Sequence, residues 1–167
     1  MRRFWMRESP QKLGEALESI GDFDIVCVGT NILNGDAVGP AVGSNLFLEG
    51  IEVHGTMSRP IHANNLIEFV STHTFTRPVV AVDAMLGSLD KIGSIVLNNK
   101  PLKPGTGVDK ALPTIGNYTI GGVIAPRGVS PILGLADTPL PFVFEVAKWI
   151  STGILIAKSK VRSGTIV

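Results

Sequence analysis

The chain has 167 residues, of which 44% are hydrophobic and 17% are charged, and its formal net charge is +1. This length suits one domain with a sizeable core, and the apolar composition excludes a disordered chain. The balance of 15 basic and 14 acidic side chains excludes a strong electrostatic attraction to nucleic acid or to an anionic membrane. We therefore expect a single domain over residues 1–167, with residues 1–10 as a candidate flexible N-terminal arm.

Two further features bear on the compartment. Three arginines lie near the N-terminus, but the apolar stretch of a secretory signal does not follow them. The apolar segment 141–157 contains Glu145 and Lys148 and is too short to span a bilayer comfortably. The one cysteine, Cys27, allows no intramolecular disulfide, so we expect a cytoplasmic protein. Within its apolar run, Cys27 fits a small buried hydrophobe better than a catalytic thiol.

Helical and strand patterns alternate along the chain. Apolar periodicity predicts helices over residues 11–20, 38–48 and 63–72, and a last helix that Thr138 can cap with Pro139 in its first position. Apolar runs predict strands over residues 25–29, 51–56, 78–83, 93–97 and 118–124. Runs that are apolar at every position fit strands buried on both sides, so the pattern predicts an α/β sheet with helices on both faces.

Two aspartates stand where the first and third strands are expected to end. Asp36 lies in the Gly-rich loop after residues 25–29, and Asp83 ends the strand over residues 78–83. Ligands and catalytic groups collect at the carboxyl ends of strands in open α/β sheets. Gly35 is expected to leave room for a group to approach the Asp36 carboxylate. Taken singly, Asp36 also fits a helix N-cap and Asp83 a turn residue.

Together, the two carboxylates predict acid–base chemistry if they converge. Two close carboxylates cannot both ionise cheaply, so the pair holds a shared proton. One can then activate a water as a base while the other donates a proton as an acid. Alternatively, both can bind a divalent metal ion through their oxygen atoms.

Other candidate site residues are a histidine and a Pro/Gly-rich loop. His62 opens the helix over residues 63–72 and can lie at the same edge of the sheet. In the loop over residues 101–113, Gly105 and Gly107 can present backbone N–H groups to an anion or oxyanion, and Lys110 can add a positive charge. The same composition also fits an ordinary surface loop. The histidine spacings match no zinc motif, and no nucleophile elbow or phosphate loop is present.

Three segments carry a resemblance to a known family. GTNILNGDAVGPAVGSNL, GTMSRPIHANNL and AVDAMLGSLDKIGSIVLNNKPLKPGTGVDKALPTIGNYTIGGVI resemble the YyaC-type sporulation proteins, and the resemblance covers roughly residues 20–157. That family is similar to the germination protease that degrades small acid-soluble spore proteins, and more distantly to the hydrogenase maturation endopeptidases. The resemblance implies a single three-layer α/β/α domain with a mostly parallel twisted sheet, of the phosphorylase/hydrolase-like kind.

The resemblance also implies roles for individual residues. The two key aspartates of the germination protease lie in segments that resemble DAVGP and VDAM, which places them on Asp36 and Asp83. Its Pro-Gly-Ser-Gly-Val loop resembles residues 104–108 of this chain. The maturation endopeptidases use acids at these two positions, together with a histidine, to read a bound metal ion. His62 is a spatial candidate for that third ligand.

The leading hypothesis is therefore a peptidase of atypical aspartic type that acts on a protein or peptide substrate without a cofactor. Its expected setting is the cytoplasm of the forespore or mother cell of a spore-forming bacterium. Asp36 and Asp83 are the expected catalytic pair, with His62, Gly105, Gly107 and Lys110 binding substrate. A divalent-metal-sensing protein that uses Asp36, Asp83 and His62, or a non-enzymatic spore protein on the same fold, is the alternative. Assembly into a homo-oligomer stays open.

Overall fold

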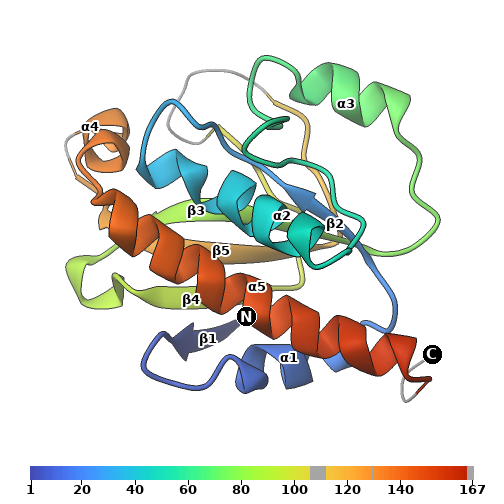
Figure 1. Ribbon diagram of the computed structural model, residues 1–167. Helices are drawn as coiled ribbons and strands as arrows, with labels where there is room; N and C mark the ends of the chain where they lie inside the picture. Colours follow the sequence, from blue (N-terminus) through green and yellow to red (C-terminus); the bar gives the residue numbers. More distant parts are fainter. Residues whose placement is uncertain (106–111, 129, 165–167) are drawn as a thin grey trace.

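Five strands form one mixed sheet in the order β1-β4-β5-β3-β2 (Figure 1). The structure is a computed structural model that describes residues 1–105, 112–128 and 130–164. The strands are β1 (Arg2–Trp5), β2 (Asp24–Cys27), β3 (Val79–Gly87), β4 (Ser94–Asn98) and β5 (Tyr118–Pro126). β2 and β5 both run parallel to β3, whereas β4 runs antiparallel to both β5 and β1.

The sheet is mostly parallel, as expected: β1, β2, β3 and β5 run in one direction, and β4 runs against them because of a short connection. Only residues 88–93, which include the 3-10 helix η2 (Leu89–Lys91), link β3 to β4. A crossover between parallel strands needs a dozen or more residues, so a link this short reverses the chain direction. Within the expected flexible arm at residues 1–10, the segment Arg2–Trp5 pairs antiparallel with β4 and becomes the far edge of the sheet.

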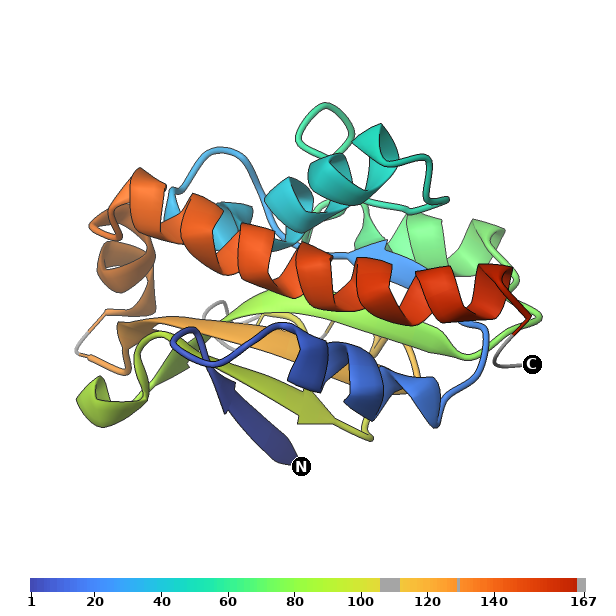
Figure 2. The same ribbon diagram turned by 60° about the horizontal axis from the view of Figure 1, so that its bottom comes forward.

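Helices cover the sheet unequally. α1 (Gln11–Glu18), α2 (Val38–Leu48) and α5 (Leu140–Arg162) pack together over one face, and Figures 1 and 2 both show α5 lying along α1 and α2. Their apolar faces form the main core, in which Leu13, Leu46 and Ile150 are fully buried. The short helix α3 (Leu66–Thr72) covers the other face through a smaller core around Leu66. These layers form the expected single α/β domain.

α5 is long and apolar enough to cross a membrane by length and composition alone. Half of its most apolar window is nevertheless buried inside the protein. Val143, Ile150 and Ile154 make no contact with solvent because they pack into the main core. In this structure α5 is therefore the central helix of the domain rather than an exposed apolar rod.

Several expected elements differ from the observed ones. α2 has the predicted bounds, but residues 51–56 form no regular strand: His54 and Ile61 make only single bridges to Val26 and Val28 beside β2. Gly55, with φ of 86°, and a turn that pairs Thr56 with Arg59 break the ladder between these bridges.

The start of α5 also corrects an expectation. Thr138 does not cap α5; its hydroxyl donates instead to the carbonyl of Gly134, 2.7 Å away. Gly134 belongs to α4 (Pro131–Ala136), a helix that the sequence reading missed. α4 has its own cap, because the Ser130 hydroxyl accepts from the N–H of Leu133.

Candidate functional site

Asp36 is positioned by the loop that leaves β2. The chain reverses at Gly29, whose φ is 142° and whose missing Cβ would lie 2.1 Å from the Asp36 carbonyl oxygen. Asp36 then lies in the 3-10 helix η1 (Gly35–Ala37), and the N–H of Thr30 donates to its Oδ2 at 2.9 Å. The Asp36 carboxylate is therefore bound by the preceding loop. It caps no helix, because the N-cap of α2 is Ala37 and has no side-chain hydrogen bond.

The sequence placed Asp83 at the end of a strand, but in the structure Asp83 lies within β3. β3 continues to Gly87 because β5 pairs with it that far, and Asp83 itself pairs with Gly121. On the other side, the last β2 pairing joins Cys27 to Val82. Asp83 is thus the first residue of β3 past the end of β2, beside the point where the chain departs toward Asp36. The N–H of Ala84 donates to its Oδ1 at 2.8 Å.

The charge of Asp36 acts on the Asp83 carboxyl. Burial raises the pKa of Asp83 well above its usual value, and the negative charge of Asp36 raises it further. Burial also raises the pKa of Asp36, while the Thr30 N–H and the nearby His62 act in the opposite direction. Both residues nevertheless keep part of their surface exposed to solvent. Such a pair keeps a proton at a pH where isolated aspartates have lost theirs.

Cys27 stands next to this pair but does not extend its chemistry. It is completely buried in the main core, as expected of a small hydrophobe. Burial and the nearby charge of Asp83 raise the pKa of its thiol. A buried thiol that holds its proton is a poor nucleophile.

His62 lies close enough to Asp36 for its charge to lower the pKa of that carboxyl. The ring Nδ1 of His62 accepts from the backbone N–H of Asn64 at 3.2 Å, and the backbone N–H of His62 donates to Oδ1 of Asn65 at 2.9 Å. The contact with Asn64 orients the ring in the turn that precedes α3. His62 is thus close enough to act on the site electrostatically.

A ready-made metal site is not assembled by these side chains. Within the described residues, no group of three or more His, Cys, Asp or Glu side chains is arranged to hold a metal ion. Asp36, Asp83 and His62 therefore do not fit a preformed three-ligand set. Binding of a divalent ion by them would need a rearrangement of the loop or of the start of α3.

Two other expectations about the site have different outcomes. Gly35 leaves no room beside Asp36, because a Cβ there would lie 2.9 Å from both the Ile124 side chain and the Leu135 carbonyl oxygen. Its role is to let η1 approach α4 and β5. Gly105 is described, with φ of 75°, whereas Gly107 and Lys110 lie outside the described residues. The anion cradle in this loop stays a prediction.

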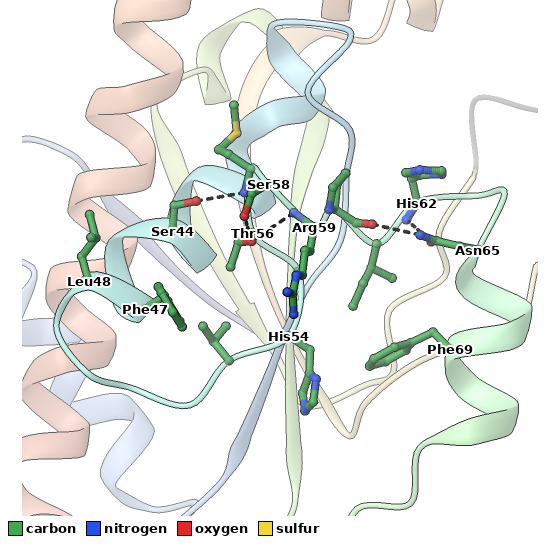
Figure 3. Close-up of a pocket in the computed structure, with 15 residues that line it drawn as sticks. Ser44, Phe47, Leu48, His54, Thr56, Ser58, Arg59, His62, Asn65 and Phe69 are labelled. Carbon is green, nitrogen blue, oxygen red and sulfur yellow. Dashed lines mark hydrogen bonds between the residues drawn. The ribbon is translucent and has the colours of Figure 1, made fainter.

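Sequence reading missed a groove that begins at His62. It has a volume of about 910 Å³ and runs along residues 53–62, between the end of α2 and the start of α3 (Figure 3). The sequence carried one signal of it: Phe47 and Leu48 end α2 outside its buried stripe, and their side chains are 66% and 82% exposed. Exposed apolar side chains that adjoin a groove are a common feature of binding surfaces.

Comparison with known proteins supports the architecture. The crystal structure of a NiFe hydrogenase maturation protease, HycI from Thermococcus kodakarensis KOD1, is similar to 86% of this chain and to 99% of its own, with a TM-score of 0.52. The two sequences are 18% identical, so this likeness concerns the fold.

A curated relative is more similar in sequence. It is the uncharacterized protein YyaC of Bacillus subtilis (strain 168), which is 37% identical over 136 residues. The alignment covers 78% of this chain, and the chain spans 66% of the length of that relative. A family described as "protein of unknown function (DUF1256)" matches residues 8–153, which include Asp36, His62 and Asp83. This chain belongs to that family, and with it to the YyaC-type proteins.

Proposed function

We propose that this protein is a peptidase that hydrolyses peptide bonds with Asp36 and Asp83. The observation that carries the proposal is the presence of two carboxylates beside the end of β2, where burial and, next, the charge of Asp36 raise the pKa of Asp83 well above its usual value. Paired carboxylates with separated pKa values are the arrangement that acid–base hydrolysis needs. The maturation-protease fold and the groove that starts at His62 support the choice of a peptide as substrate.

The environments of the two aspartates suggest which group does what. Asp83 is the more strongly perturbed, so it holds the shared proton and serves as the acid. Asp36, which accepts from Thr30, serves as the base and takes a proton from water. The water oxygen adds to the carbonyl carbon, the C–N bond breaks, and the proton from Asp83 goes to the leaving nitrogen. Backbone N–H groups near Gly105 and Gly107, and the Lys110 ammonium, are our candidates for holding the oxyanion.

The cellular setting is also part of the proposal, and membership of the family supports it. The chain belongs to the YyaC-type proteins, so we place the activity in the cytoplasm of a spore-forming cell, during sporulation or germination. The acids act there on a protein or peptide substrate without a resident cofactor.

The test is peptide cleavage by matched variants. The purified protein is incubated with a mixed peptide library, and products are identified by mass spectrometry. Asp36→Asn and Asp83→Asn keep the size of each side chain and the oxygen that accepts from Thr30 or Ala84, and each should reduce cleavage by about 10²- to 10⁴-fold. Asp90→Asn is the control because Asp90 is exposed and contacts the neighbouring Lys91 and Ser88. Full cleavage by both site variants would refute the mechanism.

A further inference from the structure

The groove beside the acid pair has a composition that points to its occupant. Figure 3 shows the end of α2 on one side, the start of α3 on the other, and the Arg59 side chain between Phe47 and Phe69. Apolar side chains dominate the α2 side, where the exposed Phe47 and Leu48 adjoin the half-buried Val53 and Met57. The described residues that line it are Ser44, Phe47, Leu48, Val53, His54, Gly55, Thr56, Met57, Ser58, Arg59, Pro60, Ile61, His62, Asn65 and Phe69.

The charge of this lining has one sign. Among the described residues that line the groove, Arg59 is the only Lys or Arg, and no Asp or Glu is present. Its side chain is exposed and makes no ion pair with any residue of the described ranges, whereas Arg77 contacts three carboxylates. A guanidinium without a partner, at the centre of a groove without carboxylates, is complementary to a carboxylate on the ligand.

The backbone of the groove floor is also available for pairing. His54 is bonded to β2 in both directions, since its carbonyl accepts from Cys27 and its N–H donates to Ile25. The backbone N–H and carbonyl of the neighbouring Val53 point away from β2 and have no hydrogen-bond partner among the described residues. An extended chain can add to such an edge through main-chain hydrogen bonds.

We propose that this groove binds an extended segment of the substrate that carries an apolar side chain close to an acidic side chain. The apolar group packs against Phe47 and Leu48, and the carboxylate pairs with Arg59. His62 lines the end of the groove and also influences Asp36, so the bound chain continues from the groove to the acid pair. The inference rests on the proposed peptidase function and assigns its substrate class.

The test measures binding without cleavage, using the full chain with Asp36→Asn and Asp83→Asn. The probes are three pools of fluorescein-labelled Ala/Gly octapeptides, each with one Leu. The first carries a Glu at one to three residues from the Leu and an amidated C-terminus, the second has Lys in place of Glu, and the third has a free C-terminus and no Glu. Fluorescence anisotropy should show the Glu pool binding about tenfold more tightly than either of the others.

Charge reversal then identifies the partner. Arg59→Glu should make the Lys pool bind more tightly than the Glu pool, and Arg59→Lys should keep the Glu preference. Arg7→Glu changes the net charge equally at an exposed residue beside Trp5 and should leave all affinities unchanged. The double change Phe47→Ser with Leu48→Ser should weaken every pool.

Three results would overturn the inference: equal binding of the Glu and Lys pools, binding that Arg59→Glu leaves unchanged, or binding of the free-C-terminus pool as tightly as the Glu pool. The two proposals fail separately. Cleavage by the wild-type protein together with any of these results removes the groove assignment alone. Charge-dependent binding without any cleavage by the wild-type protein removes the peptidase alone.

Discussion

The contact between α2 and the groove floor is tight enough to predict the effect of one methyl group. Gly43 of α2 faces Gly55, and a Cβ at Gly43 would lie 1.9 Å from the Gly55 carbonyl oxygen. Ordinary contact begins at 3.4 Å, so Gly43→Ala must push residues 53–61 away from α2. Both sides of the contact are backbone and cannot rotate aside. Overpacking of this kind costs about 1–3 kcal/mol, and we expect the upper end.

For a domain of this size, about 3 kcal/mol lowers the unfolding temperature by roughly 6–12 °C. Thermal unfolding followed by circular dichroism at 222 nm measures it directly. Gly134→Ala in α4 is the matched control, because a Cβ there would lie 3.6 Å from its nearest neighbours. That substitution should be neutral or raise stability by up to about 1 kcal/mol, since alanine favours helix more than glycine. If Gly43→Ala unfolds at the wild-type temperature, the packing described between α2 and the groove floor is wrong.

Two further predictions concern pH. Asp83→Asn should stabilise the protein at pH 7, because the folded state raises the pKa of Asp83, so that its ionisation opposes folding as pH rises through that pKa. Urea unfolding should show the gain at pH 7 and none near pH 3, and a loss of stability at pH 7 would contradict the buried-charge argument. His54 behaves in the opposite sense: burial, and next the charge of His73, lower its pKa, against the weaker effects of Glu52 and Asp24. The unfolded chain therefore binds this proton first, and stability should fall as pH decreases below about 6.5. His54→Phe, which suits the ring contacts to Phe69 and Phe75, should flatten the slope, and an unchanged slope would assign the effect to other groups.

The sequence was sufficient to predict the half of the fold that holds the acids. β2 and β3 have runs of apolar residues that are too continuous for an exposed strand, and these runs predicted a buried sheet. Helical periodicity with an early proline predicted the bounds of α2. Because β2 and β3 are parallel, two acids that follow their apolar runs reach the same region of the sheet. Placing Asp83 at a strand end was wrong, since pairing with β5 extends β3 past this acid to Gly87.

The remainder depended on contacts between distant residues. Arg2–Trp5 reads as a charged terminus, and only its pairing with β4 makes it a strand. Residues 51–56 have a strand pattern, but in the structure Gly43 of α2 packs closely against Gly55, and this segment forms only an isolated bridge to β2. The groove combines the end of α2 with residues 53–62 and α3, so no local pattern could reveal its single unpaired arginine.

The most direct measurement of the central claim is the titration of the two aspartates by NMR. Side-chain carboxyl ¹³C shifts are followed with pH in the wild-type protein, in Asp36→Asn and in Asp83→Asn. If the two carboxylates share one site, removal of either charge lowers the pKa of the other, and the two decreases are equal by thermodynamic linkage. If the pKa of Asp83 is the same with and without the Asp36 charge, the acids do not act as a pair and the proposed mechanism is contradicted.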